Sequence, residues 1–342
     1  MGQINLYDTR TMLAAINLMM PTHSFLKDTF FPIPETKLTE SIDVDFKKGK
    51  RKMAPFVAPR IGGVVMDRQG FQTRTIKPGK IAPERVITID DITTRSMGET
   101  IYSAKTPQKR AQELLATDLT DLDEYISRRE EWMCRETLIN GKIIMSGEGF
   151  EQVVDYGFTN KEALSGTNVW TDYTNSDPIA YLKEKRLQII QKTGMSPDIV
   201  VLASDVVDTF INHPKVQKLL DLTRLNIGAI EPSIKNDAVT FLGKLPLLGV
   251  EIYSYDEWFL DDDNTEKPMI PEGHIIMGVS GKSKRIYAAV TQIEKDKFVT
   301  IEGSRVPKYF VDSDNEIQKL RLTSRPLPVP EDVDSWIVSV VK

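Results

Sequence analysis

The sequence predicts an α+β protein in which a middle portion of mixed helices and strands lies between two strand-rich segments. Residues 106–140 carry helical apolar periodicity, whereas short alternating apolar stretches recur before this segment and again after residue 250. The 342 residues can bury a substantial core. No apolar run approaches the roughly 18 residues of a membrane-spanning helix, so no membrane partner is predicted.

The first segment, residues 1–41, begins with a predicted short helix capped by Asp8 or Thr9 and ended by Pro21. Its apolar face comprises Met12, Leu13, Ile16, Met19 and Met20. The following stretch is rich in Phe and Pro, and we expect it to lack regular structure. Two interpretations stay open: the segment packs on its own core, or it is an arm that contacts a neighbouring subunit through Phe25, Phe30 and Phe31.

Basic residues are concentrated in the second segment, residues 42–92. Between Val44 and Lys80 there are ten basic and two acidic residues, a net charge of +8, while the whole chain carries −5. The remainder therefore carries −13, and this balance argues against a general nucleic-acid-binding protein. The basic residues are Lys47, Lys48, Lys50, Arg51, Lys52, Arg60, Arg68, Arg74, Lys77 and Lys80.

This basic segment is predicted to form a long two-stranded arm, with strands that include residues 53–57 and 86–91. Two strands of about 20 residues would extend about 65 Å at about 3.3 Å per residue. A compact chain of this length has a radius of gyration near 20 Å, and an isolated hairpin is barely stable in water. The arm is therefore expected to need a partner; an ordinary basic loop over a local sheet is the alternative.

The third segment, residues 93–176, contains the predicted long helix. Thr106 and Pro107 provide an N-cap and a first helical residue, and Asn140 and Gly141 provide the stop. The apolar face comprises Leu115, Leu119, Leu122, Ile126 and Met133. Because Arg129 interrupts this face, we expect a structural spine rather than a coiled coil. Strands are predicted at residues 150–158 and 169–173.

The last two segments alternate helices and strands. In residues 177–295 we predict helices at 177–192, 204–213 and 216–222, and strands at 199–202, 250–255, 274–279 and 285–290. In residues 296–342 we predict strands at 298–302, 317–322 and 335–340, with a proline-rich link at Pro326, Pro328 and Pro330.

Catalytic and metal-binding motifs are incomplete throughout the sequence. Gly281-Lys282-Ser283 resembles the end of a phosphate-binding loop, but Ile276 stands where the first glycine is needed. Residues 261–272 resemble a calcium loop that has Glu266 in place of its glycine. The histidines, His23, His213 and His274, lie far apart, and the only cysteine, Cys134, lies within the long helix. We therefore predict no catalytic residue, metal ligand or cofactor; an enzyme with dispersed catalytic residues is the alternative.

Three stretches in this order resemble a known family. They are Ile76-Lys77-Pro78 with Ile81-Ala82-Pro83, then Leu138 to Lys142 with Met145 to Phe150, and finally Ser324 to Pro328. The chain is similar to the major capsid proteins of lambda-like tailed bacteriophages, the major capsid protein E family. The resemblance implies the Hong Kong 97-type fold: N-terminal arm (1–41), extended loop (42–92), peripheral domain with spine helix (93–176), axial domain (177–295), and C-terminal strands returning to the peripheral domain (296–342).

The resemblance also implies a structural function without catalysis. Copies of the chain would form hexamers and pentamers of an icosahedral shell around double-stranded DNA, without sequence-specific DNA contacts. It implies assembly in the host cytoplasm with a scaffolding protein, a decoration protein and a portal as further partners, and a final location in the virion. The basic residues from Lys47 to Lys77 and the three phenylalanines would then contact neighbouring subunits. An encapsulin-like nanocompartment shell is the alternative with the same fold.

Overall fold

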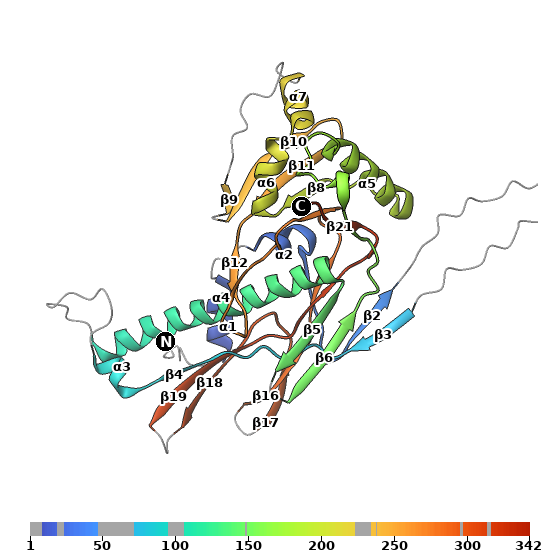
Figure 1. The fold of residues 1–342 in the computed structure, drawn as a ribbon. Helices are drawn as coiled ribbons and strands as arrows, with labels where there is room; N and C mark the ends of the chain where they lie inside the picture. Colours follow the sequence, from blue (N-terminus) through green and yellow to red (C-terminus); the bar gives the residue numbers. More distant parts are fainter. Residues whose placement is uncertain are drawn as a thin grey trace, which may run out of the picture.

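The long helix α4 (Pro107–Asn140) divides the molecule into an upper and a lower part (Figure 1). The computed structural model describes residues 9–18, 24–46, 72–94, 106–147, 149–222, 234–236, 238–294, 297–312 and 316–342. The upper part lies above the C-terminal half of α4 and holds the largest sheet. The lower part is elongated and contains several small sheets.

Local sequence signals define both ends of α4, as predicted. The Thr106 hydroxyl accepts a hydrogen bond from the Lys109 amide at 3.3 Å, and Pro107 occupies the first turn. Gly141 ends the helix in the left-handed conformation, with φ of 66°. The predicted apolar face is buried from Leu115 to Met133.

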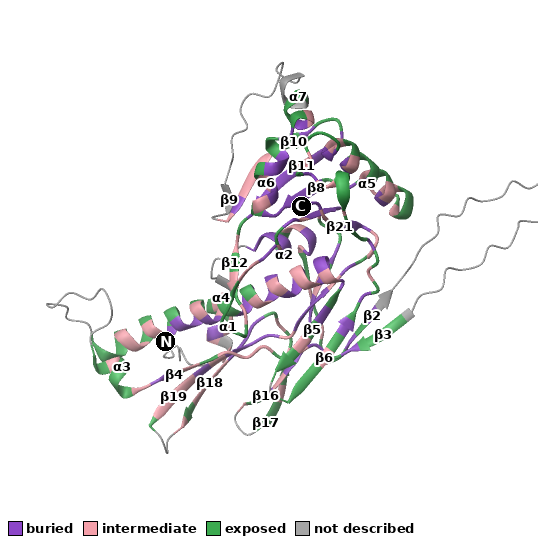
Figure 2. Cartoon of the chain, in the orientation of Figure 1, coloured by how far each residue is buried: buried purple, intermediate pink, exposed green. Residues whose placement is uncertain are grey.

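The upper part is built on a seven-stranded mixed sheet. Its order is β7 (Lys161–Ala163), β21 (Trp336–Val340), β14 (His274–Gly278), β8 (Ile199–Leu202), β11 (Val250–Tyr255), β10 (Val239–Leu245) and β9 (Ile234–Asn236). Helices α5 (Pro178–Thr193), α6 (Ser204–Ile211) and α7 (Pro214–Leu222) accompany it. All four residues of β8 are buried, as expected for a central strand covered on both faces (Figure 2).

The lower part contains smaller sheets. Strands β18 (Val306–Asp312), β19 (Ile317–Thr323) and β4 (Glu84–Ile87) form one; β1 (Ile33–Thr36), β15 (Lys284–Tyr287) and β20 (Pro326–Val329) form another. The two-stranded pairs are β2 (Ile42–Phe46) with β3 (Gln72–Ile76), β5 (Lys142–Gly147) with β6 (Phe150–Asp155), and β16 (Val290–Glu294) with β17 (Lys297–Ile301). A further hairpin, β12 (Trp258–Leu260) with β13 (Glu266–Pro268), lies near the spine. Helix α1 (Thr9–Leu18) contacts β18, and η1 (Gly166–Asn168) is a short 3-10 helix.

Three predictions near the chain ends are wrong. The Phe- and Pro-rich stretch after residue 21 forms helix α2 (Phe25–Phe30) and strand β1. The proline-rich link is strand β20, which tolerates Pro326 and Pro328 because β20 is at the edge of its sheet. Strand β21 joins the upper sheet beside β14, although we expected all C-terminal strands to return to the peripheral domain.

Two predicted strands also differ. Residues 86–91 are divided between the end of β4 and helix α3 (Ile89–Thr93), whose Thr88 cap pairs reciprocally with Asp91. Residues 169–173 form turns rather than a strand, and the buried Trp170 donates its amide to the Val341 carbonyl at 2.9 Å. A local cap at Thr88 and a bond from Trp170 to the distant C-terminal segment replace the strand pairing that the apolar pattern favoured.

Candidate subunit-contact site

The root of the predicted arm is an antiparallel pair. Ile42 pairs with Ile76, Val44 with Arg74, and the last described pair joins Phe46 to Gln72. Ile42, Val44 and Ile76 are buried against the β5–β6 hairpin and the spine. This apolar face anchors the hairpin to the body.

The arm covers fewer residues than the predicted 42–92, because its second strand, β3, ends at Ile76. Residues 77–83 then connect β3 to β4, which joins the β18–β19 sheet by pairing with β19. Residues 77–92 therefore belong to the body. Among the described residues, the arm comprises β2 paired with β3.

Two of the nine basic residues predicted to contact subunits lie among the described residues. Arg74 donates to the Asp155 carbonyl at 3.1 Å, and the exposed Lys77 forms an ion pair with Glu40 at 3.1 Å. The other seven, Lys47, Lys48, Lys50, Arg51, Lys52, Arg60 and Arg68, lie outside the described residues. Their contact with a neighbouring subunit stays a prediction.

The structure corrects the prediction that Phe25, Phe30 and Phe31 contact another subunit. All three are buried in the core of their own chain, and Phe31 has no exposed surface. The Phe25 ring packs against Tyr253 and Tyr255, with centroids 5.4 and 5.3 Å away. This is the alternative in which the N-terminal segment packs on its own core, because α2 places its apolar side against the spine and the upper sheet.

A buried ionic network attaches the lower sheets to the spine. Arg305 donates to Glu130 at 2.5 Å, to Asp123 at 2.5 Å and to the Ser127 hydroxyl at 3.1 Å. Burial opposes the charge of the guanidinium, but the two carboxylates outweigh that effect and raise the pKa of Arg305. The network holds the loop before β18 in a fixed position on α4. The sequence does not indicate this network, because Glu130 and Arg305 are 175 positions apart.

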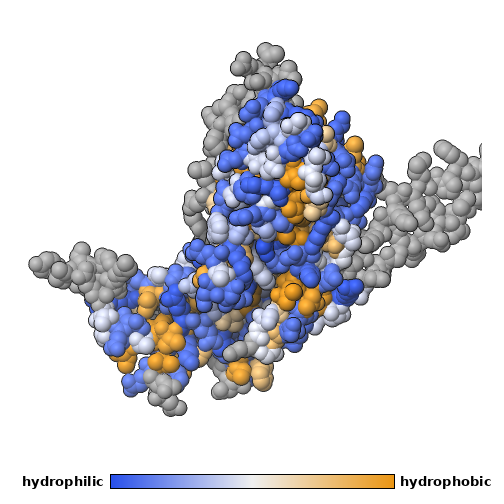
Figure 3. Space-filling view, viewed as in Figure 1, coloured by the Kyte–Doolittle hydropathy of each residue, from blue (hydrophilic) through white to orange (hydrophobic). Residues whose placement is uncertain are grey.

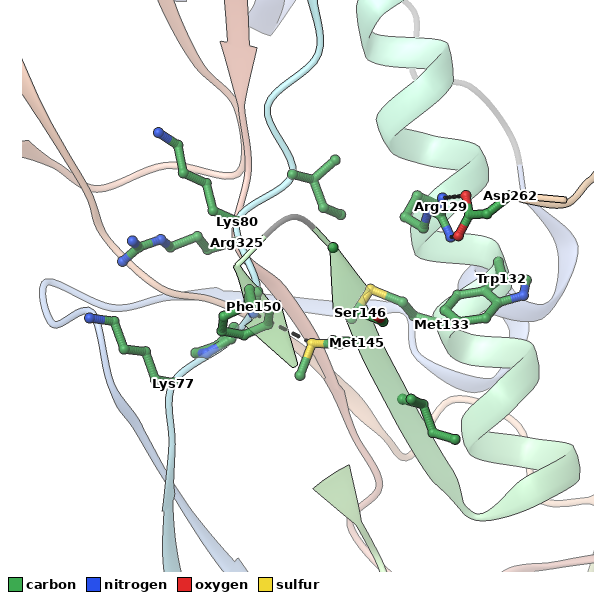
Figure 4. Close-up of a pocket in the computed structure, with 15 residues that line it drawn as sticks. Lys77, Lys80, Arg129, Trp132, Met133, Met145, Ser146, Phe150, Asp262 and Arg325 are labelled. Atoms are coloured by element: carbon green, nitrogen blue, oxygen red, sulfur yellow. Dashed lines mark hydrogen bonds and ion pairs between the residues drawn. The ribbon is translucent and has the colours of Figure 1, made fainter. Parts of the chain in front are cut away.

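A cavity of about 590 Å³ lies where the chain leaves the arm, between α4 and the β5–β6 turn (Figure 4). Trp132, Met133, Met145 and Phe150 provide its apolar lining, and an Arg129–Asp262 ion pair of 2.5 Å lies at its rim. Nearby, Ile144 and Val153 form an exposed cross-strand pair. Apolar surface gathers beside β5 and β6 in the space-filling view (Figure 3). This surface next to the arm root suits contact with another macromolecule better than catalysis.

The residues considered for chemistry have structural roles. Cys134 is fully buried, and burial raises the pKa of its thiol. His213 is buried, lies 3.0 Å from the Ser176 hydroxyl and accepts from the Lys215 amide; burial lowers its pKa. In the calcium-loop look-alike, Asp261 and Asp263 both pair with Lys267 of the β12–β13 hairpin.

The described part of the chain contains neither a metal-binding cluster nor a membrane-spanning helix. No group of three or more His, Cys, Asp or Glu side chains there is placed to hold a metal ion. No helix among the same residues is long and apolar enough to cross a membrane.

Comparisons with known proteins agree with this arrangement. The family model "Phage major capsid protein E" matches residues 8–341. The chain is 22% identical over 345 residues to the P21 prophage-derived major head protein of Escherichia coli O6:H1, covering 99% of this chain and 100% of the relative. It is 22% identical over 353 residues to the major capsid protein of Escherichia phage lambda, covering 98% of each.

A solved structure extends the similarity to the fold. The putative capsid protein of a prophage of E. coli CFT073 superposes with a TM-score of 0.72 at 22% identity, covering 98% of this chain and 99% of that one. The architecture is the Hong Kong 97-type capsid fold, with α4 as its spine. The chain belongs to the phage major capsid protein E family and is a structural protein of a phage head.

Proposed function

We propose that copies of this chain assemble into hexamers and pentamers of a closed icosahedral head around double-stranded DNA, and that the arm of each copy lies on its neighbour. The anchored root of the hairpin, β2 paired with β3, is the observation that carries the proposal. If the segment between the two strands, residues 47–71, is extended as a two-stranded arm, it reaches about 40 Å at about 3.3 Å per residue.

Charge supports this use of the arm. The segment from Val44 to Lys80 carries +8 and the rest of the chain −13. An arm of one sign that meets a neighbour of the other sign gains attraction and orientation during assembly. Each exposed pair contributes little alone, so we expect the effect to depend on the basic residues together.

The finer features of assembly follow from the family. We propose that a scaffolding protein directs assembly in the host cytoplasm, that a portal and a decoration protein join the shell, and that the chain performs no catalysis. A single buried thiol, Cys134, suits the reducing cytoplasm. The chain's net charge of −5 suits a shell that encloses DNA without adsorbing it tightly.

Electron microscopy of negatively stained full-length protein tests the proposal across a series of protein and salt concentrations, with and without the scaffolding protein. We expect closed shells, tubes or capsomer rings from the natural sequence. The triple variant Lys50→Glu, Arg51→Glu, Lys52→Glu should stay unassembled while its circular dichroism and thermal midpoint are unchanged.

A matched control replaces three exposed lysines outside the arm with glutamate: Lys183, Lys218 and Lys282. Its net charge equals that of the arm variant, so assembly of the control separates arm contacts from total charge. Normal shells from the arm variant would show that the arm's charges are not needed for assembly. A natural sequence that stays monomeric even with its scaffolding protein would overturn the proposed assembly itself.

A further inference from the structure

Two carboxyl groups and one tyrosine form a cluster where three elements meet. Glu131 lies on α4 and is 1% exposed. Its carboxyl accepts the Leu26 amide of α2 at 2.7 Å and the Lys27 amide at 2.8 Å. The Tyr255 hydroxyl, at the end of β11, lies 2.8 Å from Glu131 Oε1 and also hydrogen-bonds the Glu257 carboxyl.

Both contacts of the tyrosine are hydrogen bonds only when the cluster holds one proton beyond the tyrosine's own. A tyrosine hydroxyl has one hydrogen and can donate it to only one of the two carboxyl groups. The contact with the other carboxyl is a hydrogen bond only if that carboxyl is protonated and donates to the tyrosine oxygen. If both carboxyl groups were ionised, one of the two contacts would bring a carboxylate oxygen against the tyrosine oxygen with no hydrogen between them.

The charged groups around the cluster have other partners. The Lys27 ammonium, on α2, lies 3.8 Å from Glu130; Arg285, on β15, pairs with Asp28; and Arg305 pairs with Glu130 and Asp123. Cys134, one turn along α4, is a buried thiol whose pKa is raised by burial. Among the described residues, no ion pair involves either carboxyl of the cluster.

Burial has the expected effect on the buried carboxyl. It raises the pKa of Glu131 from 4.5 to about 7, although the hydrogen bonds from Leu26, Lys27 and Tyr255 oppose the increase. Burial, and then the nearby carboxylates, raise the pKa of Tyr255 as well, so the tyrosine stays protonated. The proton that leaves as the pH rises is therefore the one shared with the carboxyl groups.

We propose that Glu131, Tyr255 and Glu257 form a one-proton clasp that fastens the β11–β12 connection to the spine helix and opens when the proton is lost. On deprotonation, half-exposed Glu257 turns towards water, whereas buried Glu131 cannot. Tyr255 then donates to Glu131, which keeps its two bonds to α2. The loosened residues are 256–260, the start of the β12–β13 hairpin. Their remaining contacts are backbone bonds: Asp256 donates to the Ala238 carbonyl at 2.9 Å, Glu257 accepts the Met269 amide at 2.8 Å, and β12 pairs with β13.

Other contacts confine the movement to this connection. Arg129 pairs with Asp262, and Arg135 donates to the Met269 carbonyl at 3.0 Å, so the far side of the hairpin stays on the spine. Trp258 and Leu260 are 55% and 63% exposed and lie within the loosened strand. The clasp thus controls how two large apolar side chains are presented. It concerns the folded chain alone and does not depend on the proposed assembly.

The direction of the pH effect follows from the raised pKa. A carboxyl that holds its proton more tightly when folded stabilises the fold fully below its ordinary pKa of 4.5. That contribution is lost as the pH rises through about 7. As the pH rises towards about 7, loss of the proton should shift the equilibrium towards the open clasp by at most about tenfold per pH unit, and this shift should level off above about pH 7.

Hydrogen–deuterium exchange of residues 256–260 in the full-length protein, corrected for intrinsic exchange rates, measures this opening. Protection of the natural sequence should fall between about pH 5 and about pH 7 and then level off. In Glu257→Gln the introduced amide donates to Tyr255, which donates to Glu131, so protection should stay high at every pH. Tyr255→Phe removes the link and should lower protection at every pH.

Glu266→Gln is the matched control, because Glu266 is exposed on β13 of the same hairpin and lies outside the cluster. It should keep the pH dependence of the natural sequence. The clasp is overturned if Glu257→Gln also keeps that dependence, or if protection of the natural sequence does not change with pH. Should Tyr255→Phe fail to fold, the pH dependence of protection in Glu257→Gln compared with Glu266→Gln still tests the clasp.

Discussion

The parts above and below the spine helix are stabilised in different ways. Above it, one continuous cluster of buried apolar residues surrounds the seven-stranded sheet. Below it, two smaller apolar clusters serve several small sheets. Buried charged side chains gather along the spine itself, where Glu130 and Arg305 are 3% and 9% exposed.

This difference shows what each part can do alone. A continuous apolar core gives the upper part stability without reference to a partner. The lower part divides its apolar surface among thin sheets and exposes pairs such as Ile144 and Val153. Its position on the spine depends on ionic contacts as well as on the apolar contact of α4 with Leu320 and Leu322. Such a part suits a protein whose lower surfaces are covered by other copies.

Replacement of Arg305 by Met should have the largest effect, because it breaks the ionic attachment of the lower part. Glu130 and Asp123 would lose the Arg305 guanidinium within a buried site, and only the Lys27 ammonium, 3.8 Å from Glu130, would remain beside them. We expect a loss of about 4 kcal/mol in the free energy of unfolding, measured by urea denaturation. Arg128→Met is the control: its ion pair with Glu124 is exposed and should contribute less than about 1 kcal/mol. Equal losses from both variants would contradict a special role for the buried network.

Phe31→Ala tests the apolar side of the comparison. Phe31 has no exposed surface and belongs to the upper core, so its truncation should cost about 3 kcal/mol in the free energy of unfolding of the monomer. Phe298→Ala, at a residue 81% exposed, should leave monomer stability unchanged. A stable Phe31→Ala monomer that fails to assemble would instead restore the prediction that this phenylalanine contacts a neighbour.

What the sequence could predict depends on how local the signals are. Thr106, Pro107 and Gly141 lie within one turn of the ends of α4, so both ends were predicted correctly. Strand β20 was missed because Pro326 and Pro328 usually interrupt strands, and only the sheet order places them at an edge. The pairing of β21 with β14 likewise joins segments about 60 residues apart, for which no local signal exists.

The contact site was predictable to a similar extent. The density of lysine and arginine between Lys47 and Lys77 indicated an arm, and the register of Ile42 with Ile76 confirmed a hairpin at its root. Burial of Phe25 could not be decided from sequence, because an aromatic side chain suits a core and an interface equally well. The clasp at Glu131 requires three distant segments to meet, and an isolated glutamate on a helix does not indicate that.

Gly141→Ala tests the junction where the spine ends and the two parts diverge. Gly141 has φ of 66°, and an added Cβ would lie 2.2 Å from the Cβ of Phe158. The strained conformation and the clash together should cost about 2 kcal/mol in the free energy of unfolding. Gly157→Ala separates the two causes, since Gly157 has φ of 69° but no atom within 4 Å of an added Cβ. A smaller loss at Gly157 isolates the clash, whereas equal losses would assign the whole effect to the backbone.

Thr106→Ala should have the smallest effect, because it acts at the far end of the spine, away from both apolar parts. The Thr106 hydroxyl satisfies one amide of the first turn, and its loss should cost about 1 kcal/mol in the free energy of unfolding. Thr117→Ala is the control within the same helix: its exposed hydroxyl bonds the Glu113 carbonyl, and alanine should be neutral or stabilising there by a few tenths of a kcal/mol. Because fraying starts at helix ends, hydrogen exchange in Thr106→Ala should increase over residues 107–112 and stay unchanged near Glu130. Faster exchange at Glu130 would mean that the spine melts as one unit, so that the ionic network does not hold its middle independently of its tip.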